Sequence, residues 1–79
     1  MNVTALRSII AGCCNDVIFT HNGKKAGVTV EVKDFVPTFQ AWYGPDTKDF
    51  LDVDVLMQDQ FFDGRSLCDL VDETEFTVL

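Results

Sequence analysis

The dipeptide Asn22-Gly23 constrains the fold more than any other part of this chain. It stands between two runs in which apolar and polar residues alternate, and it suits a two-residue turn in which both residues need positive φ. Such a turn pairs His21 with Lys24 and keeps the apolar partners of both runs on one face. A four-residue loop over 22–25 has the same parity, whereas a three-residue loop needs a bulge. The sequence therefore predicts an antiparallel hairpin.

The same pairing decides which side chains of the hairpin face the core. It places Phe19 opposite Ala26 and Val17 opposite Val28, so the apolar partners share one face. The opposite face of the second strand is polar and carries Thr29, Glu31 and Lys33. This alternation is typical of an antiparallel sheet that is covered on one side.

A third strand is predicted over Thr38–Tyr43, after a connection over Lys33–Pro37. Its more apolar face points to the core, which leaves Trp42 on the open face beside Thr29 or Glu31 of the neighbouring strand. The core-facing residues of this strand are Phe39, Ala41 and Tyr43.

A helix is predicted before the hairpin, over Val3–Cys14, with Asn2 or Thr4 as its N-cap and Asn15 at its end. Its apolar residues recur at helical spacing, which predicts that one face of the helix packs on the sheet. These residues are Leu6, Ile9, Ile10 and Cys13.

After a turn at Gly44-Pro45-Asp46, residues Lys48–Leu51 form either a short fourth strand or an extended approach to a second helix. Asp52 caps this helix, and Asp63-Gly64 ends it with Gly64 as a left-handed cap. Its apolar face carries Val53, Leu56, Met57 and Phe61.

A third helix begins at Ser66, where Asp69 completes a capping box, and the tail Glu75–Leu79 is either an edge strand or a loose end. The apolar residues of this helix are Leu67, Leu70 and Val71. Residues 1–79 are thus predicted to form a single α+β domain. It comprises an N-terminal helix, a three- to four-stranded antiparallel sheet and two short C-terminal helices packed on one sheet face.

The charge of the chain is unevenly distributed. The net charge is −7, and residues 46–79 hold ten acidic and only two basic residues, against three acidic and four basic residues before them. This distribution argues against direct binding to nucleic acid or to an anionic membrane, because both need a basic footprint. It permits a basic protein partner, but a solvated acidic face that keeps a small protein soluble is the simpler explanation.

No catalytic, cofactor or metal site is predicted. The only histidine, His21, stands beside a turn, no glycine-rich phosphate loop is present, and neither Cys13 nor Cys14 has a basic neighbour. The aspartates do not follow the alternating spacing of a calcium loop. Three cysteines indicate reduced thiols in a cytoplasmic protein, and a bridge from Cys13 to Cys68 is the alternative.

The candidate binding residues lie between Trp42 and Asp63. Carboxylates along a turn and an exposed helix face can contact a basic surface or imitate phosphates, and an exposed aromatic residue among them favours a protein contact or a homodimer face. The alternative for Phe61 and Phe62 is that both close the core where the helix ends. The predicted partner-binding residues are Trp42, Asp46, Asp49, Asp52, Asp54, Asp59, Phe62 and Asp63.

Residues 42–67 carry an aromatic-Gly turn, a V-D-x-L-M helix and an F-D-G-R-S-L segment. This run resembles small acidic proteins of Gram-positive bacteria, several of them carried on mobile elements. The resemblance implies no active site. The order of elements and the acidity are also similar to one class of phage anti-CRISPR proteins, without a shared motif.

Three functions follow as hypotheses. The first is a non-enzymatic protein–protein interaction module that acts through the acidic segment and Trp42. The second is a nucleic-acid mimic that inhibits a DNA- or RNA-binding protein. The third is an enzyme or small-ligand binder with a pocket between sheet and helices.

Overall fold

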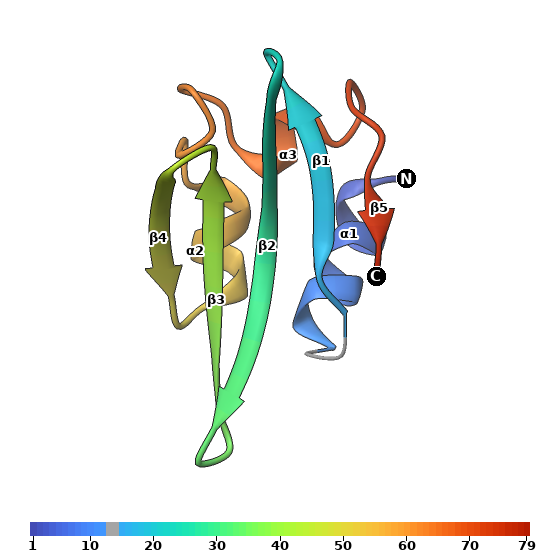
Figure 1. Cartoon of the computed structure of the whole chain (residues 1–79). Helices are drawn as coiled ribbons and strands as arrows, with labels where there is room; N and C mark the ends of the chain where they lie inside the picture. Colours follow the sequence, from blue (N-terminus) through green and yellow to red (C-terminus); the bar gives the residue numbers. More distant parts are fainter. Residues whose placement is uncertain (13–14) are drawn as a thin grey trace.

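The chain folds into an α+β domain, seen in a computed structural model that describes residues 1–12 and 15–79 (Figure 1). Three helices and five strands make up the described part, and every pair of neighbouring strands is antiparallel. The elements in chain order are α1 (Val3–Ala11), β1 (Val17–His21), β2 (Lys24–Lys33), β3 (Val36–Tyr43), β4 (Asp46–Phe50), α2 (Val53–Gln58), α3 (Leu67–Leu70) and β5 (Thr77–Val78).

The β1–β2 hairpin has the predicted two-residue turn and register. His21 pairs with Lys24, and Asn22 and Gly23 have φ values of 51° and 77°. The predicted pairs Phe19 with Ala26 and Val17 with Val28 are also present. The turn residues therefore determine the face on which each side chain of the two strands lies.

The sheet has five strands in the order β4-β3-β2-β1-β5, rather than the predicted three to four. The additional strands form because Gly44-Pro45 is a two-residue turn that pairs Tyr43 with Asp46, and because Thr77 and Val78 pair with β1. The predicted alternatives for Lys48–Leu51 and for the tail are thus resolved as strands. β4 covers the edge of β3 as far as the pair of Phe39 with Phe50.

The β2–β3 hairpin is longer than predicted. The connection is only Asp34-Phe35, and β3 begins at Val36 instead of Thr38. Along β2 and β3, hydrogen-bonded pairs alternate with pairs that are not hydrogen-bonded, and Pro37 opposite Val32 is one of the latter. Proline is therefore accommodated at this position. Its nitrogen points toward a stretch that β4 does not reach, so the missing N–H breaks no strand pairing.

The helices end earlier than predicted. α1 is capped by Asn2, whose Oδ1 accepts a 2.7 Å hydrogen bond from the Ala5 N–H, and its C-cap is Gly12 rather than Asn15. Position 13 of the predicted helix lies outside the described residues. α2 begins after the predicted Asp52 cap but ends at Gln58. The Ser66–Asp69 capping box of α3 is present as predicted.

Asp63-Gly64 does not end a helix but forms a two-residue turn of its own. Phe62 and Arg65 exchange two backbone hydrogen bonds of 3.0 Å across it, and the turn residues have φ values of 55° and 76°. Because the chain has left the helix before this point, Phe61 and Phe62 both turn toward the core.

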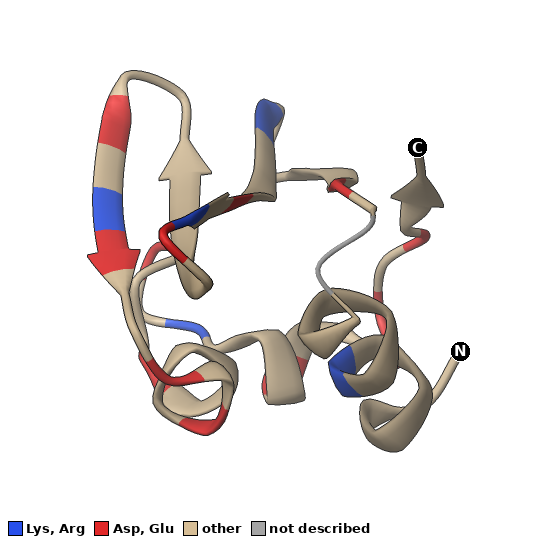
Figure 2. Cartoon of the chain, turned by 90° about the horizontal axis from the view of Figure 1, so that it is seen from below, with Lys and Arg blue, Asp and Glu red and all other residues tan. Residues whose placement is uncertain are grey.

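All three helices lie on one side of the sheet, and no described element covers the other side (Figure 2). The core fills the space between the helices and the sheet. Phe62 lies within it, with its ring centroid 5.2 Å from that of Phe19 and 6.4 Å from that of Tyr43. None of the described helices has the length and apolar composition needed to cross a membrane. The completely buried core side chains include Leu6, Ile10, Val17, Val28, Leu56, Phe62, Leu67 and Leu70.

Candidate protein-binding surface

Trp42 lies on the uncovered face of the sheet, as predicted, but its neighbour is Gly27 and not Thr29 or Glu31. A Cβ atom on Gly27 would lie 2.6 Å from Trp42 Cζ2 and 2.8 Å from Cε2, so the indole ring lies directly over the glycine. The ring is partly buried in this position. The absence of a side chain at Gly27 thus leaves room for the indole ring directly against the backbone of the sheet.

A row of paired residues crosses the whole sheet through Trp42. Directly paired residues share a face, so Thr47 and Ile18 flank the indole and its glycine, and Thr77 completes the row. We call the residues Ile18, Trp42, Thr47 and Asp49 the sheet-face surface. Ile18 is partly exposed, and Thr47 and Asp49 are exposed. The face therefore combines a flat aromatic ring with short polar side chains.

Asp49 is the acidic residue of this surface. It lies opposite Gln40, whose Nε2 donates a 3.2 Å hydrogen bond to Asp49 Oδ1. Asp46 is exposed at the start of β4 and pairs with Tyr43. No described side chain forms an ion pair with Asp46 or Asp49. These two carboxylates are thus the predicted acids that remain available to a partner.

The other predicted acids have partners within the fold. Arg7 Nε lies 2.6 Å from Asp54 Oδ1, and Lys48 Nζ lies 2.8 Å from Asp59 Oδ2. Asp52 accepts hydrogen bonds from the first turn of α2 through Oδ1. Figure 2 shows that the acidic positions of β4 and α2 lie on the side of the molecule away from the two termini. The structure therefore places the acids side by side but uses several of them internally.

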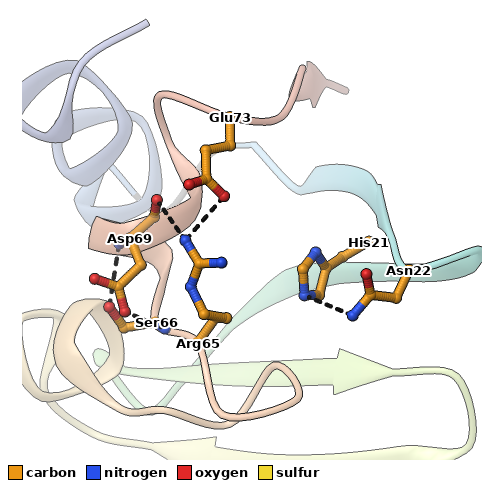
Figure 3. Close-up of polar contacts among 6 residues, drawn as sticks. All are labelled: His21, Asn22, Arg65, Ser66, Asp69 and Glu73. Atoms are coloured by element: carbon orange, nitrogen blue, oxygen red, sulfur yellow. Dashed lines mark hydrogen bonds and ion pairs between the residues drawn. The ribbon is translucent and has the colours of Figure 1, made fainter.

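The turn at Asp63-Gly64 is joined to the β1–β2 hairpin. Asn22 Nδ2 donates a 2.8 Å hydrogen bond to Asp63 Oδ2. The same nitrogen lies 3.3 Å from His21 Nε2 (Figure 3). His21 accordingly takes part in a small polar contact between two turns. Asp63 contributes to the fold in the same way as Asp52, Asp54 and Asp59 do.

Two carboxyl groups have lowered pKa values. The hydrogen bond from Arg7 lowers the pKa of Asp54 below its ordinary value of 3.8 and raises that of Arg7. Backbone and side-chain hydrogen bonds from Ser66 lower the pKa of Asp69, and Figure 3 shows this capping box beside the ion pair of Arg65 with Glu73. These shifts mark structural contacts, since both carboxyl groups are held by neighbours within the fold.

The prediction that Phe62 contacts a partner is wrong. Its side chain is completely buried on the helix side of the sheet, away from Trp42. The alternative, in which Phe61 and Phe62 close the core, agrees with the structure. The ring centroids of the two residues lie 5.1 Å apart, and Phe61 packs against the core. Adjacent phenylalanines can both reach the core here because they lie on non-helical backbone.

A hollow of about 440 Å³ lies beside β1, where β5 no longer pairs with it. Its lining contains no histidine or cysteine, and the described residues hold no cluster suited to a metal ion. Cys68 is a partly buried free thiol, whereas Cys13 and Cys14 of the alternative bridge lie outside the described residues. The lining residues are Ile18, Phe19, Thr20, Lys25, Glu73–Glu75 and Thr77.

Sequence reasoning missed one exposed apolar site, the tip of the β2–β3 hairpin. Phe35 is 100% exposed, and Val32 and Val36 are each 53% exposed. The available signal was the continued alternation of Val28, Val30 and Val32, which already extended β2 toward position 34.

No protein-family model, curated protein or solved structure matches the chain significantly. The resemblance of residues 42–67 to small acidic proteins of Gram-positive bacteria stays a prediction.

Proposed function

We propose that the protein is a non-enzymatic module that binds a basic protein through the sheet-face surface and the adjoining acidic strand β4. The observation that carries this proposal is the position of Trp42, which lies on an uncovered sheet face with its ring seated over Gly27. Tryptophan is enriched where proteins bind one another, and a ring that is already fixed loses little entropy on binding.

The charge of the chain favours a basic partner. The chain has a net charge of −7, and two exposed carboxylates of β4 have no cationic partner among the described residues: Asp49, on the same face as the indole, and Asp46, which pairs with Tyr43 at the start of the strand. A basic surface would compensate these carboxylates and would be attracted over a distance at low salt. We place this function in the cytoplasm, as the odd number of cysteines suggests.

Nucleic-acid mimicry remains the second proposal, with less support. A mimic needs carboxylates that are free to replace phosphates, yet Asp52, Asp54, Asp59 and Asp63 are engaged within the fold. Binding by mimicry falls steeply as the salt concentration rises, whereas a contact centred on an aromatic ring persists. Salt dependence therefore separates the two proposals.

The test uses tagged full-length chain to capture proteins from cells that express it naturally. We expect Asp49→Lys and Trp42→Ala to weaken capture of one basic protein about tenfold each, as interface centres do. The matched control is Asp72→Lys, which changes the charge equally at an exposed position in the segment between α3 and β5. Circular dichroism checks that each variant is folded.

Each outcome has a defined meaning. Equal losses for Asp49→Lys and Asp72→Lys, together with release by moderate salt and competition by nucleic acid, would support mimicry instead. Unchanged capture by Asp49→Lys and Trp42→Ala would overturn the sheet-face proposal. Recovery of a second copy of the chain would point to a homodimer, which light scattering measures directly.

A further inference from the structure

We infer that the tip of the β2–β3 hairpin is a separate binding element, which inserts the Phe35 ring into an apolar pocket of another protein. The inference does not depend on the sheet-face surface. It rests on the shape of this hairpin, the backbone conformation of its turn and the exposure of its apolar side chains.

The hairpin projects beyond the rest of the sheet. β1 pairs with β2 only as far as Val28, and β4 pairs with β3 only as far as Phe39. Residues 31–38 therefore form a two-stranded arm, and no strand of the described part of the chain pairs with either side of it. Figure 1 shows this arm extending past the helices. We call these residues the hairpin arm. An arm of this shape is convex and can enter a cleft of a partner.

In the turn of the arm, a phenylalanine occupies a backbone conformation with positive φ, which is unfavourable for this residue type. Residues 1–12 and 15–79 contain three two-residue turns in which both residues have positive φ, and two of these turns, Asn22-Gly23 and Asp63-Gly64, have glycine in second place. The third turn has Phe35 there, with a φ of 65°. Bulky residues rarely adopt this conformation, and glycine adopts it without strain.

No packing of the Phe35 ring within the chain offsets this backbone strain. Its side chain is 100% exposed, so it buries no surface and stabilises no neighbour. Strained residues concentrate at sites where function requires them. Binding to another molecule is the role that uses both the strained backbone and the exposed ring.

The neighbours of Phe35 extend the apolar surface on both sides of the arm. Val32 lies opposite Pro37 on the helix side, and Val36 lies opposite Lys33 on the other side. Val32 and Val36 are each about half exposed. Leu51, which is also exposed, follows the last β4 residue at the base of the arm. A pocket for this tip therefore needs room for one phenyl ring and apolar walls around it.

Charge and shape favour a protein pocket over a membrane or a second copy. A membrane surface would be bound by basic residues, but Lys33 is beside Asp34 and the chain is strongly acidic. In a second copy, the hollow beside β1 is lined mostly by threonines, Lys25 and glutamates, which do not suit a phenyl ring. The partner is thus a protein with an apolar pocket at its surface.

The experiment places a photo-crosslinking benzoylphenylalanine at position 35 of the full chain, in cells that express it naturally. The matched control carries the same group at position 72, which is exposed and follows α3. Figure 1 shows α3 at the end of the sheet opposite the arm. We expect position 35 alone to yield one discrete crosslinked protein, with the crosslink mapping to apolar residues. Crosslinks to lipid, to a second copy or to many proteins equally would overturn the inference.

Competition with unlabelled chain provides the decisive comparison. We expect wild-type chain to suppress the crosslink. Phe35→Gly chain should need a roughly 30-fold higher concentration for the same suppression, as expected for a residue at the centre of an interface. Asp72→Lys chain should compete like wild type, because position 72 is exposed and belongs neither to the arm nor to the sheet-face surface. Equal competition by Phe35→Gly and wild type would overturn the inference.

Phe35→Gly should weaken binding without lowering the stability of the fold. Phe35→Gly relieves the strained turn, so its midpoint in urea should equal or exceed that of wild type, and lost competition cannot then be attributed to unfolding. A lower midpoint for Phe35→Gly would contradict the argument that the ring serves binding rather than folding.

Discussion

At the scale of single residues, Gly27 determines how Trp42 lies. A Cβ atom at this position would be 2.4 Å from the Val17 carbonyl oxygen and 2.6 Å from the indole ring. The carbonyl belongs to a paired strand and cannot move freely, so an alanine would displace both the strand and the ring. The seat of Trp42 is therefore a property of one glycine.

We predict that Gly27→Ala destabilises the protein by about 1–3 kcal/mol. Urea unfolding followed by the fluorescence of Trp42, the only tryptophan, measures the change. Gly12→Ala is the control, because a Cβ there meets nothing closer than 3.4 Å and the φ of −67° is ordinary for alanine. Equal stability of Gly27→Ala and wild type would show that the indole does not depend on this contact.

The lowered pKa of Asp69 predicts a pH dependence of stability. A carboxyl whose pKa is lower in the folded chain than in the unfolded chain stabilises the fold above the unfolded value, and this contribution disappears as the pH falls through the folded value. We therefore expect Asp69→Asn to be less stable than wild type at pH 7, with a difference that shrinks below the ordinary pKa of 3.8. Unfolding of both proteins at pH 7 and pH 3 measures it, and a constant difference would contradict the role of the charged form.

At the scale of elements, the N-cap of α2 is the part of the acidic segment whose structural role is clearest. Asp52 Oδ1 accepts hydrogen bonds of 2.7 Å and 3.3 Å from the N–H groups of Asp54 and Val55. We predict that Asp52→Ala costs about 1 kcal/mol of unfolding free energy, whereas Asp46→Ala, which removes an exposed carboxylate without an ion-pair partner in the described structure, changes it little. Thermal unfolding compares the two variants, and equal losses would mean that the general charge matters and the cap does not.

Turns explain which elements could be predicted from the sequence. Asn22-Gly23 predicted the first hairpin with its register, because both residues suit positive φ. Asp34-Phe35 adopts the same conformation but contains no turn residue in second place, so the second hairpin was predicted too short. Asp63-Gly64 was interpreted as a helix end because Phe61 continues the helical spacing of the preceding apolar residues.

The candidate surface was predictable to the same extent. The alternation of β3 placed Trp42 on the open face correctly, but its true neighbour Gly27 depends on the register set by the unrecognised turn at Asp34-Phe35. The burial of Phe62 depends on where α2 ends, which spacing alone could not decide. Internal partners of the acids, such as Arg7 for Asp54, come from elements 47 positions apart and leave no local pattern.

At the scale of the whole molecule, the net charge of −7 opposes folding more than the ion pairs support it. The three ion pairs in the described structure join side chains that are mostly well exposed, and such pairs contribute about 0–1 kcal/mol each. The remaining carboxylates repel one another across a domain with a radius of gyration of 11.4 Å. This distance is comparable to the screening length of about 10 Å at 0.1 M salt, so moderate salt screens the repulsion across the molecule.

We therefore predict that the melting temperature rises by a few degrees when sodium chloride increases from about 10 mM to about 200 mM. Asp46→Lys should raise the melting temperature at low salt and reduce the effect of salt, because it removes one repelling carboxylate and adds an attracting charge on the acidic side of the molecule. Choline chloride at equal ionic strength tests whether screening, rather than a specific sodium site, is responsible. A melting temperature that falls with both salts would show that the ion pairs outweigh the repulsion, and that the acidic side is balanced within the fold rather than available to a basic partner.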